Sequence, residues 1–150
     1  MNFSQTRIAV FGGRKISDNI YQKAYKLGCL LAKEGYLVYC GGGKGVMEAI
    51  SKGVSESGGT CVGILKGLTL DGMNDFIKVP IATNMGTSRN ALLAYNCDAA
   101  VAISGQYGTL SEIAYAKQLE KPIIGLHSWA IEGLENVESP SEVIQFLKDN

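Results

Sequence analysis

The residues best suited to chemistry lie in one segment, Asp98–Glu112, and at Arg89 upstream of it. Residues 98–103 form a short apolar run of small side chains, which is typical of a strand buried on both faces. A turn with two glycines follows, and a helical pattern opens directly after it; the turn runs Ser104-Gly105-Gln106-Tyr107-Gly108. A strand, a glycine turn and a helix start together aim backbone amides and the positive end of the helix at an anion, usually a phosphate. We therefore predict that the protein binds a phosphorylated small molecule.

Two interpretations are open for Glu112. The spacing Thr109-x-x-Glu112 predicts a capping box, in which the hydroxyl and the carboxylate each satisfy a free backbone N–H at the helix start. Capping alone would account for this glutamate without any ligand. A glutamate held at a helix start is also well placed to act as an acid or a base.

Arg89 follows a predicted strand and stands beside two hydroxyl residues, Thr87 and Ser88. A guanidinium offers a bidentate fork that suits phosphate, and the two hydroxyls can add hydrogen bonds to it. The alternative is an arginine on the exposed face of a helix, which would need no function.

A second glycine turn resembles the first. It runs Gly42-Gly43-Lys44-Gly45, lies between an apolar run and a helical pattern, and shares the glycine spacing of residues 105–108. A third glycine pair, Gly12 and Gly13, ends the first apolar run. Any α/β domain needs glycine where a strand reverses into a helix. Two matching turns together with an arginine favour the interpretation that the turns bracket one ligand.

Familiar nucleotide motifs are incomplete. Lys44 does not complete a P-loop, because Val38 stands where the first glycine should be and Gly45 replaces the hydroxyl residue that holds magnesium. The run from Gly41 lacks the third glycine of the dinucleotide fingerprint, since Val46 stands there. These departures argue against an NTPase and, more weakly, against a dehydrogenase.

Composition narrows the class of protein. The 150 residues are most simply one domain, 1–150. The chain has 14 basic and 14 acidic residues, so it lacks the basic excess that is typical of nucleic-acid binding proteins. No apolar run is long enough to span a bilayer, no signal peptide is evident, and the four cysteines form no CxxC pair. We therefore expect a cytoplasmic protein that does not bind membranes. The only histidine, His127, has no nearby cysteine in sequence, so we expect no metal site.

Apolar runs alternate with helical patterns along the whole chain. Strands are expected at 7–11, 36–40, 60–65, 76–81, 98–103 and 123–127, with Pro80 indicating a sheet edge or a strand end. Ser17 and Ser139 are predicted helix caps, and the turn-rich loop 66–75 is the expected mobile lid. The alternation predicts an α/β fold: a single-domain, doubly wound, mostly parallel, Rossmann-like sheet. Ligands of such sheets bind beyond the carboxyl ends of the strands.

The segments 85–91 (MGTSRNA) and 103–112 (ISGQYGTLSE) closely resemble the LOG-like superfamily. That superfamily includes cytokinin-activating phosphoribohydrolases, molybdenum cofactor carrier proteins and members mislabelled as lysine decarboxylases. The LOG enzymes carry a PGGxGTxxE motif with an upstream arginine. The resemblance implies that Glu112 and Arg89 are the catalytic pair if this chain is a hydrolase, and that Gly105, Gly108 and Thr109 occupy phosphate-binding positions.

The chain departs from the LOG motif at three positions. Ser104 replaces the motif proline, Gln106 replaces its second glycine, and Asn90 stands where lysine is usual. The resemblance is therefore closer to the molybdenum cofactor carrier branch. No Schiff-base lysine with a cofactor pocket is evident, which argues against a decarboxylase.

Three functional hypotheses follow. The first is a protein that binds a phosphorylated purine- or pterin-type molecule, such as the molybdenum cofactor, and releases it intact. The second is a nucleoside 5′-monophosphate phosphoribohydrolase. The third is an interaction module whose pocket has lost its function. No cofactor is required in any of them, and the resemblance implies a homodimer or a higher homo-oligomer.

Overall fold

The computed structural model describes residues 3–150, and these residues form a seven-stranded, wholly parallel sheet in the order β4-β3-β2-β1-β5-β6-β7. Its strands are β1 (Arg7–Gly12), β2 (Leu37–Cys40), β3 (Cys61–Leu65), β4 (Val79–Ala82), β5 (Ala99–Ile103), β6 (Ile123–Leu126) and β7 (Asn136–Val137). The helices are α1 (Asp18–Lys33), α2 (Val46–Glu56), α3 (Asn90–Tyr95), α4 (Tyr107–Gln118) and α5 (Pro140–Asp149), with a 3-10 helix η1 (Gly86–Arg89) before α3. The predicted α/β, doubly wound, Rossmann-like class is confirmed.

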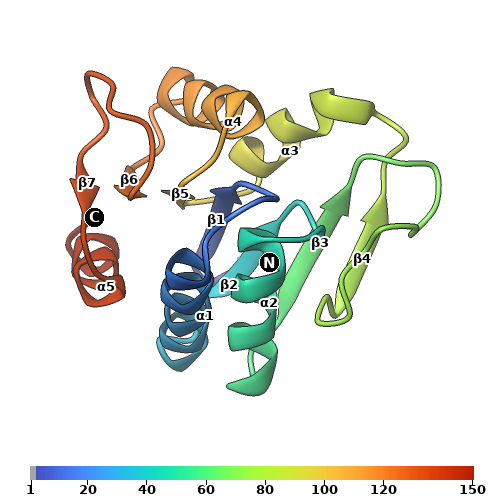
Figure 1. The fold of residues 1–150 in the computed structure, drawn as a ribbon, viewed down its shortest axis with the longest axis horizontal. Coiled ribbons are helices and arrows are strands. Elements are labelled where there is room, and N and C mark those ends of the chain that lie inside the picture. The colour runs from blue at the N-terminus through green and yellow to red at the C-terminus, as the bar shows by residue number, and fades with distance from the viewer. Residues whose placement is uncertain (1–2) are drawn as a thin grey trace.

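Helices cover both faces of the sheet. Figure 1 shows α1, α2 and α5 on one side of the sheet and α3 and α4 on the other. The central strand β1 serves both layers because successive side chains of a strand point to opposite faces. Ile8 and Val10 pack in the core under α1, α2 and α5, whereas Ala9 and Phe11 pack in the core under α3 and α4. Both faces of the central strands are therefore apolar, as the unbroken hydrophobic runs predicted.

The predicted helix boundaries have local causes that the structure confirms. The Ser17 hydroxyl accepts a hydrogen bond from the Ile20 amide at 3.2 Å and caps α1. Gly35, with φ of 79°, follows the end of that helix. At α5 the Ser139 hydroxyl accepts from the Glu142 amide at 3.3 Å, and Pro140 occupies the first turn.

The strand order reverses between β1 and β5, which lie side by side in the middle of the sheet. From β1 the chain moves outward through β2, β3 and β4, and then returns to pair β5 with the other edge of β1. A crevice opens at the carboxyl ends of two strands that diverge in this way. The turn after β1 and the turn after β5 both begin there.

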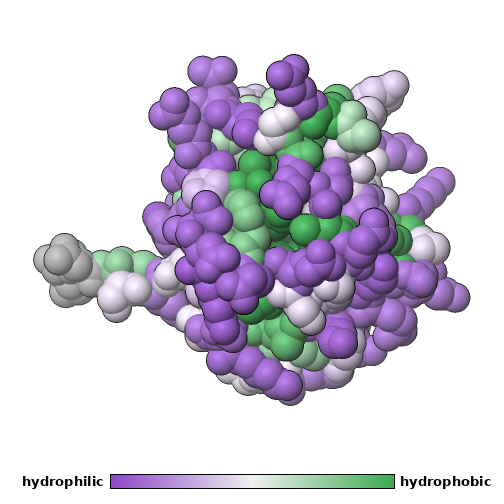
Figure 2. Space-filling model, turned by 90° about the vertical axis from the view of Figure 1, so that its left-hand side faces the viewer, coloured by the Kyte–Doolittle hydropathy of each residue, from purple (hydrophilic) through white to green (hydrophobic). Residues whose placement is uncertain are grey.

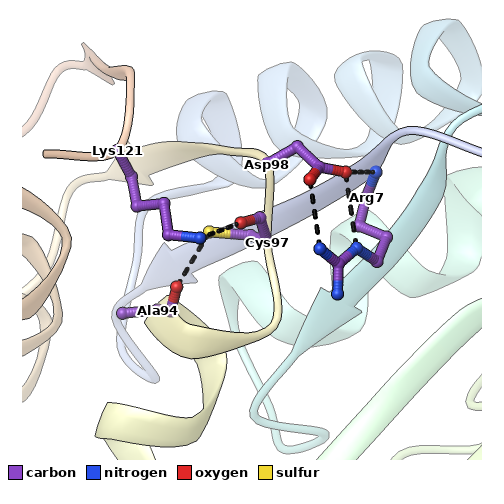
Figure 3. Close-up of polar contacts among 5 residues, drawn as sticks. All are labelled: Arg7, Ala94, Cys97, Asp98 and Lys121. Atoms are coloured by element: carbon purple, nitrogen blue, oxygen red, sulfur yellow. Dashed lines mark hydrogen bonds and ion pairs between the residues drawn. The ribbon is translucent and has the colours of Figure 1, made fainter. Parts of the chain in front are cut away.

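The opposite ends of β1 and β5 are tied together by an ion pair, drawn in Figure 3. The Arg7 amide donates to the Asp98 carboxylate at 2.8 Å, and its guanidinium donates to the same group at 3.1 Å. The hydrogen bond from Arg7 lowers the pKa of Asp98 below its ordinary value. Beside this pair, the Lys121 ammonium donates to the Cys97 carbonyl at 2.7 Å. These contacts fix the amino ends of the two strands whose carboxyl ends carry the site.

Two predictions about strands need correction. The strand expected at 76–81 is β4, which begins only at Val79; it does lie at the sheet edge, as Pro80 indicated. The two-residue strand β7 was not predicted, because two residues carry no periodicity.

The outer side of the fold, where β7 and α5 lie, is covered largely by hydrophilic side chains, with hydrophobic ones visible between them (Figure 2). Within residues 3–150, no helix is both long enough and apolar enough to cross a membrane.

Candidate functional site

A cavity of about 570 Å³ lies at the carboxyl ends of the central strands. Small-molecule sites generally enclose about 300–1,000 Å³. Most of the residues predicted for the site line this cavity: Gly12, Gly13, Gly43, Thr87, Arg89, Ser104, Gly105, Gln106, Gly108, Thr109 and Glu112. The remaining predicted residues are not among those that line it: Gly42, Lys44, Gly45, Ser88 and Tyr107. The three glycine turns therefore meet at one cavity, although only part of each turn faces it.

The turns pack directly on one another, which explains their glycines. A Cβ built on Gly45 would lie 2.3 Å from the Gly13 carbonyl oxygen, and that same oxygen accepts a hydrogen bond from the Val46 amide at 3.0 Å. A Cβ on Gly13 would lie 3.2 Å from the Cα of Gly105. Because larger side chains would separate the turns, glycine holds them close enough to share one cavity.

Two carbonyls of the turn after β5 bond to the segment after β6. Ser104 and Gly105 both have positive φ, at 51° and 101°. The Ser104 carbonyl accepts from the Ser128 hydroxyl at 2.9 Å, and the Gln106 carbonyl accepts from the indole N–H of Trp129 at 3.1 Å. In a trans peptide the N–H points opposite to the C=O, so the next amide along the chain points away from Ser128 and Trp129 in each case. No side chain within residues 3–150 caps the start of helix α4. Its first amides and its positive end are free for an anion.

The predicted capping box is wrong. Helix α4 begins at Tyr107, so Thr109 is its third residue rather than its cap, and the position before the helix is held by Gln106. Thr109 instead packs against Gly105, where a Cβ would lie 2.2 Å from the Thr109 hydroxyl oxygen. Capping therefore does not account for Glu112.

Glu112 is buried at the cavity wall, with 8% of its surface exposed. Among residues 3–150 its carboxyl group has no hydrogen-bond partner and no ion pair within 4 Å. Burial raises its pKa to about 8, although the positive charge of Arg89 opposes that rise. At neutral pH the group is therefore mainly a neutral carboxylic acid, which can donate a hydrogen bond into the cavity.

Arg89 is not the exposed surface arginine of the alternative interpretation. Its Nη1 donates to the carbonyls of Gly41 at 2.9 Å and Ile64 at 2.7 Å, and its Nε donates to the Asn90 side chain at 2.9 Å. Burial lowers the pKa of the guanidinium below its ordinary value, while Glu112 raises it. The free bidentate fork that was predicted is also wrong, since most of the guanidinium donors already have acceptors. The neighbouring hydroxyl of Ser88 donates to the Met85 carbonyl at 2.6 Å.

Sequence reasoning missed several charged residues of the cavity. Arg14 and Lys15 line it directly after the glycine pair that ends β1, and Lys66 and Asp71 line it from the loop after β3. Their sequence signal was their position at the carboxyl end of a strand. Lys44 was the lysine chosen instead, and it is exposed.

Asn74 holds the turn after β2 and was also missed. It is 2% exposed, and its Nδ2 donates to the carbonyls of Gly42 at 3.2 Å and Gly43 at 2.8 Å. Its Oδ1 accepts from the Ser51 hydroxyl at 2.9 Å and from the Phe76 amide at 2.9 Å. The loop 66–75, predicted as a lid, is thus anchored at this end to the turn that it covers.

No three histidine, cysteine or acidic side chains come together as metal ligands within the part of the chain that the structure describes. All four cysteines are free thiols. The charged residues that line the cavity are four basic ones and two acidic ones: Arg14, Lys15, Lys66, Arg89, Asp71 and Glu112.

Comparison with known proteins identifies the family of the chain. The model of the SLOG cluster4 family matches residues 5–149. The chain belongs to this family. An uncharacterized protein of Archaeoglobus fulgidus is 38% identical to this SLOG protein over 141 residues, covering 93% of each chain.

Two further relatives are described by function. A probable cytokinin riboside 5′-monophosphate phosphoribohydrolase of Oryza sativa subsp. japonica is 33% identical over 114 residues, which is 71% of this chain and 46% of the rice protein. The chain thus spans about half the length of that enzyme. The molybdenum cofactor binding protein of Rippkaea orientalis has the same fold, with a TM-score of 0.92 at 29% identity over 99% of this chain and 98% of that one. The resemblance to the LOG-like superfamily, nearest its molybdenum cofactor carrier branch, is confirmed.

Proposed function

We propose that this SLOG cluster4 protein binds a phosphorylated pterin-type molecule, the molybdenum cofactor or a close analogue, and releases it unchanged. The observation that carries the proposal is the cavity in which the uncapped start of α4 and the Arg89 guanidinium face one space. The likeness to the Rippkaea orientalis protein along almost the whole chain supports the choice of ligand.

The charges of the cavity suit an anion with more than one negative charge. Arg14, Lys15, Lys66 and Arg89 contribute four positive charges to its lining, and Asp71 contributes one negative charge. With Glu112 neutral, the lining carries a net charge of +3. The phosphate binds at the amides of α4, where the helix end stabilises negative charge. The remaining cations face other anionic groups of the ligand.

The protonation of Glu112 favours binding over hydrolysis. A general base that activates water must be deprotonated, and a carboxyl with a pKa of about 8 is mainly protonated at neutral pH. The neutral acid is instead a hydrogen-bond donor for a ring nitrogen or carbonyl of the ligand. Its lack of charge also avoids repulsion with the phosphate.

One observation favours the second candidate, a nucleoside 5′-monophosphate phosphoribohydrolase. Glu112 is not used as a helix cap and lines the same cavity as Arg89, as a proton donor to a leaving base would. In that reaction the C1′–N bond breaks with oxocarbenium-like charge on the ribose, and the base departs with the bonding electrons and a proton from Glu112. Water then adds at C1′ and gives one proton back to the Glu112 carboxylate, which restores the acid. The rate would then fall as the pH rises through about 8, because the acid form is lost.

Native mass spectrometry of freshly purified protein, paired with an adenine-release assay on AMP, tests both candidates. Co-purified molybdopterin without adenine release supports the carrier. Steady adenine release that the Glu112→Gln variant lacks supports the hydrolase. If the protein carries no pterin, binds no AMP and releases no adenine, both candidates fail and the cavity has no such ligand.

A further inference from the structure

We propose that Asn90 is the positioning residue of the anion site, which ties the Arg89 guanidinium to the start of α4 so that the two bind one anion together. The inference rests on the proposed function and deepens it. Asn90 itself lines the cavity, but its amide oxygen bonds Arg89 and its amide nitrogen bonds Ser111. The inference therefore predicts that Asn90 acts on ligand binding through Arg89.

The first step is the fixed orientation of the Asn90 amide. Asn90 is 7% exposed; its Oδ1 accepts from Arg89 Nε at 2.9 Å, and its Nδ2 donates to the Ser111 hydroxyl oxygen at 3.1 Å. The Ser111 hydroxyl itself donates to the Gly108 carbonyl at 2.6 Å, so its oxygen is an acceptor toward Asn90. A weaker contact of 3.5 Å joins Nδ2 to the same carbonyl. An amide turned the other way would lose the bonds on both sides.

The second step is the count of guanidinium donors. Arginine has five N–H donors, one on Nε and two on each terminal nitrogen. Asn90 takes the Nε proton, and the carbonyls of Gly41 and Ile64 take the two protons of Nη1. Neither proton of Nη2 has an acceptor in the described part of the chain. Arg89 thus presents a single nitrogen to the ligand, in a direction that three acceptors fix.

The third step is the link to α4. Both α4 partners of Asn90, Gly108 and Ser111, belong to the first turns of that helix, whose amides are free. Asn90 is therefore the side chain that bonds the guanidinium on one side and the helix start on the other. Groups held in their bound geometry before the ligand arrives bind it more tightly, because less ordering is left for the binding step.

The first test needs no ligand. In the wild type we expect the Arg89 Nε–H to give a protected side-chain NMR signal, which its loss in Arg89→Met would assign. We expect Asn90→Ala to abolish that protection and Ser111→Ala to reduce it. Asn96→Ala is the matched control, because the Asn96 amide donates to the Leu92 carbonyl at the far end of α3. An unchanged Arg89 signal in a folded Asn90→Ala variant overturns the proposal. Should that variant not fold, Ser111→Ala decides, and an unaltered signal there overturns the proposal as well.

The second test is a double-mutant cycle on the affinity for AMP and for inorganic phosphate. Asn90→Ala should weaken binding about tenfold, the usual effect of losing a hydrogen bond to a charged group. In an Arg89→Met background the same change should cost no further affinity. An equal loss in both backgrounds would show that Asn90 contacts the ligand itself and would overturn its positioning role.

The two proposals fail separately. If the wild type binds neither AMP nor phosphate, the proposed function is contradicted. The role of Asn90 can still be tested in that case, because the Arg89 Nε signal is measured without a ligand. Conversely, the wild type could carry molybdopterin while the Arg89 Nε signal stays unchanged in Asn90→Ala. That result would support the proposed function and overturn this inference.

Discussion

Replacing Glu112 by glutamine should stabilise the protein, and the gain should grow with pH. Glu112 is 8% exposed at the cavity wall, and its carboxyl group has no hydrogen-bond partner among residues 3–150. Burial raises its pKa from 4.5 to about 8. In the unfolded chain the group loses its proton near pH 4.5, whereas the folded protein keeps it until about pH 8. Between those values the folded state binds more protons than the unfolded state, so folding stability falls as pH rises.

The size of this effect follows from the pKa. Each pH unit between the two values costs about 1.36 kcal/mol, so Glu112 lowers the free energy of unfolding by about 3 kcal/mol at pH 7 and about 5 kcal/mol above pH 8. Glutamine has a similar shape and no charge to bury. We therefore expect Glu112→Gln to match the wild type near pH 4.5 and to exceed its stability by those order-of-magnitude amounts at higher pH.

Urea unfolding at pH 5, 7 and 8.5 measures the difference directly. Glu132→Gln, at an exposed loop position, is the matched control and should follow the wild type at every pH. If Glu112→Gln is no more stable than the wild type at pH 8.5, the carboxyl is solvated or paired, and its assignment as a neutral donor in the cavity is wrong. A confirmed gain would mean that the wild type keeps a destabilising group at its site, as functional sites often do.

Three further substitutions test the supports of the cavity. Gly41→Ala places a Cβ 2.7 Å from Arg89 Nη1 and 2.8 Å from Met47 Sδ, so the guanidinium must shift off the Gly41 and Ile64 carbonyls. Phosphate titration should show about tenfold weaker binding, with about 1–3 kcal/mol of destabilisation in urea; unchanged affinity would contradict the assigned place of Arg89. Gly105→Ala meets Thr109 at 2.2 Å with φ of 101°, and urea unfolding should show a loss of about 2–4 kcal/mol. Asn74→Ala breaks the buried hydrogen bonds to the turn after β2, so we expect about 2–3 kcal/mol of destabilisation and faster amide exchange in loop 66–75; native-like exchange there would show that Asn74 does not anchor it.

The strands and glycine turns were predictable because their signals are local. An apolar run that ends in glycine, as at Gly12, marks a buried strand and its reversal whatever the rest of the chain does. The rule that parallel strands carry ligands at their carboxyl ends also placed Arg89 beside the two glycine turns. The pairing of Arg89 with Glu112 came from the resemblance to the LOG-like superfamily.

The details that decide the chemistry were not local. The pattern Thr109-x-x-Glu112 fits a capping box, but α4 begins at Tyr107, since positive φ at Ser104 and Gly105 turns the chain into the helix earlier. The donors of Arg89 are taken by carbonyls 25 and 48 residues away in sequence, which no spacing can reveal. The sequence therefore identified Arg89 and Glu112 as candidate site residues, whereas tertiary contacts decide what each of them can do.

A crystal structure of the protein with AMP tests the central claim most directly, because it places the phosphate. We predict phosphate oxygens within hydrogen-bond distance of the amides of residues 107–109 and of Arg89 Nη2. A phosphate that lies elsewhere, away from both the start of α4 and this guanidinium, would contradict the account.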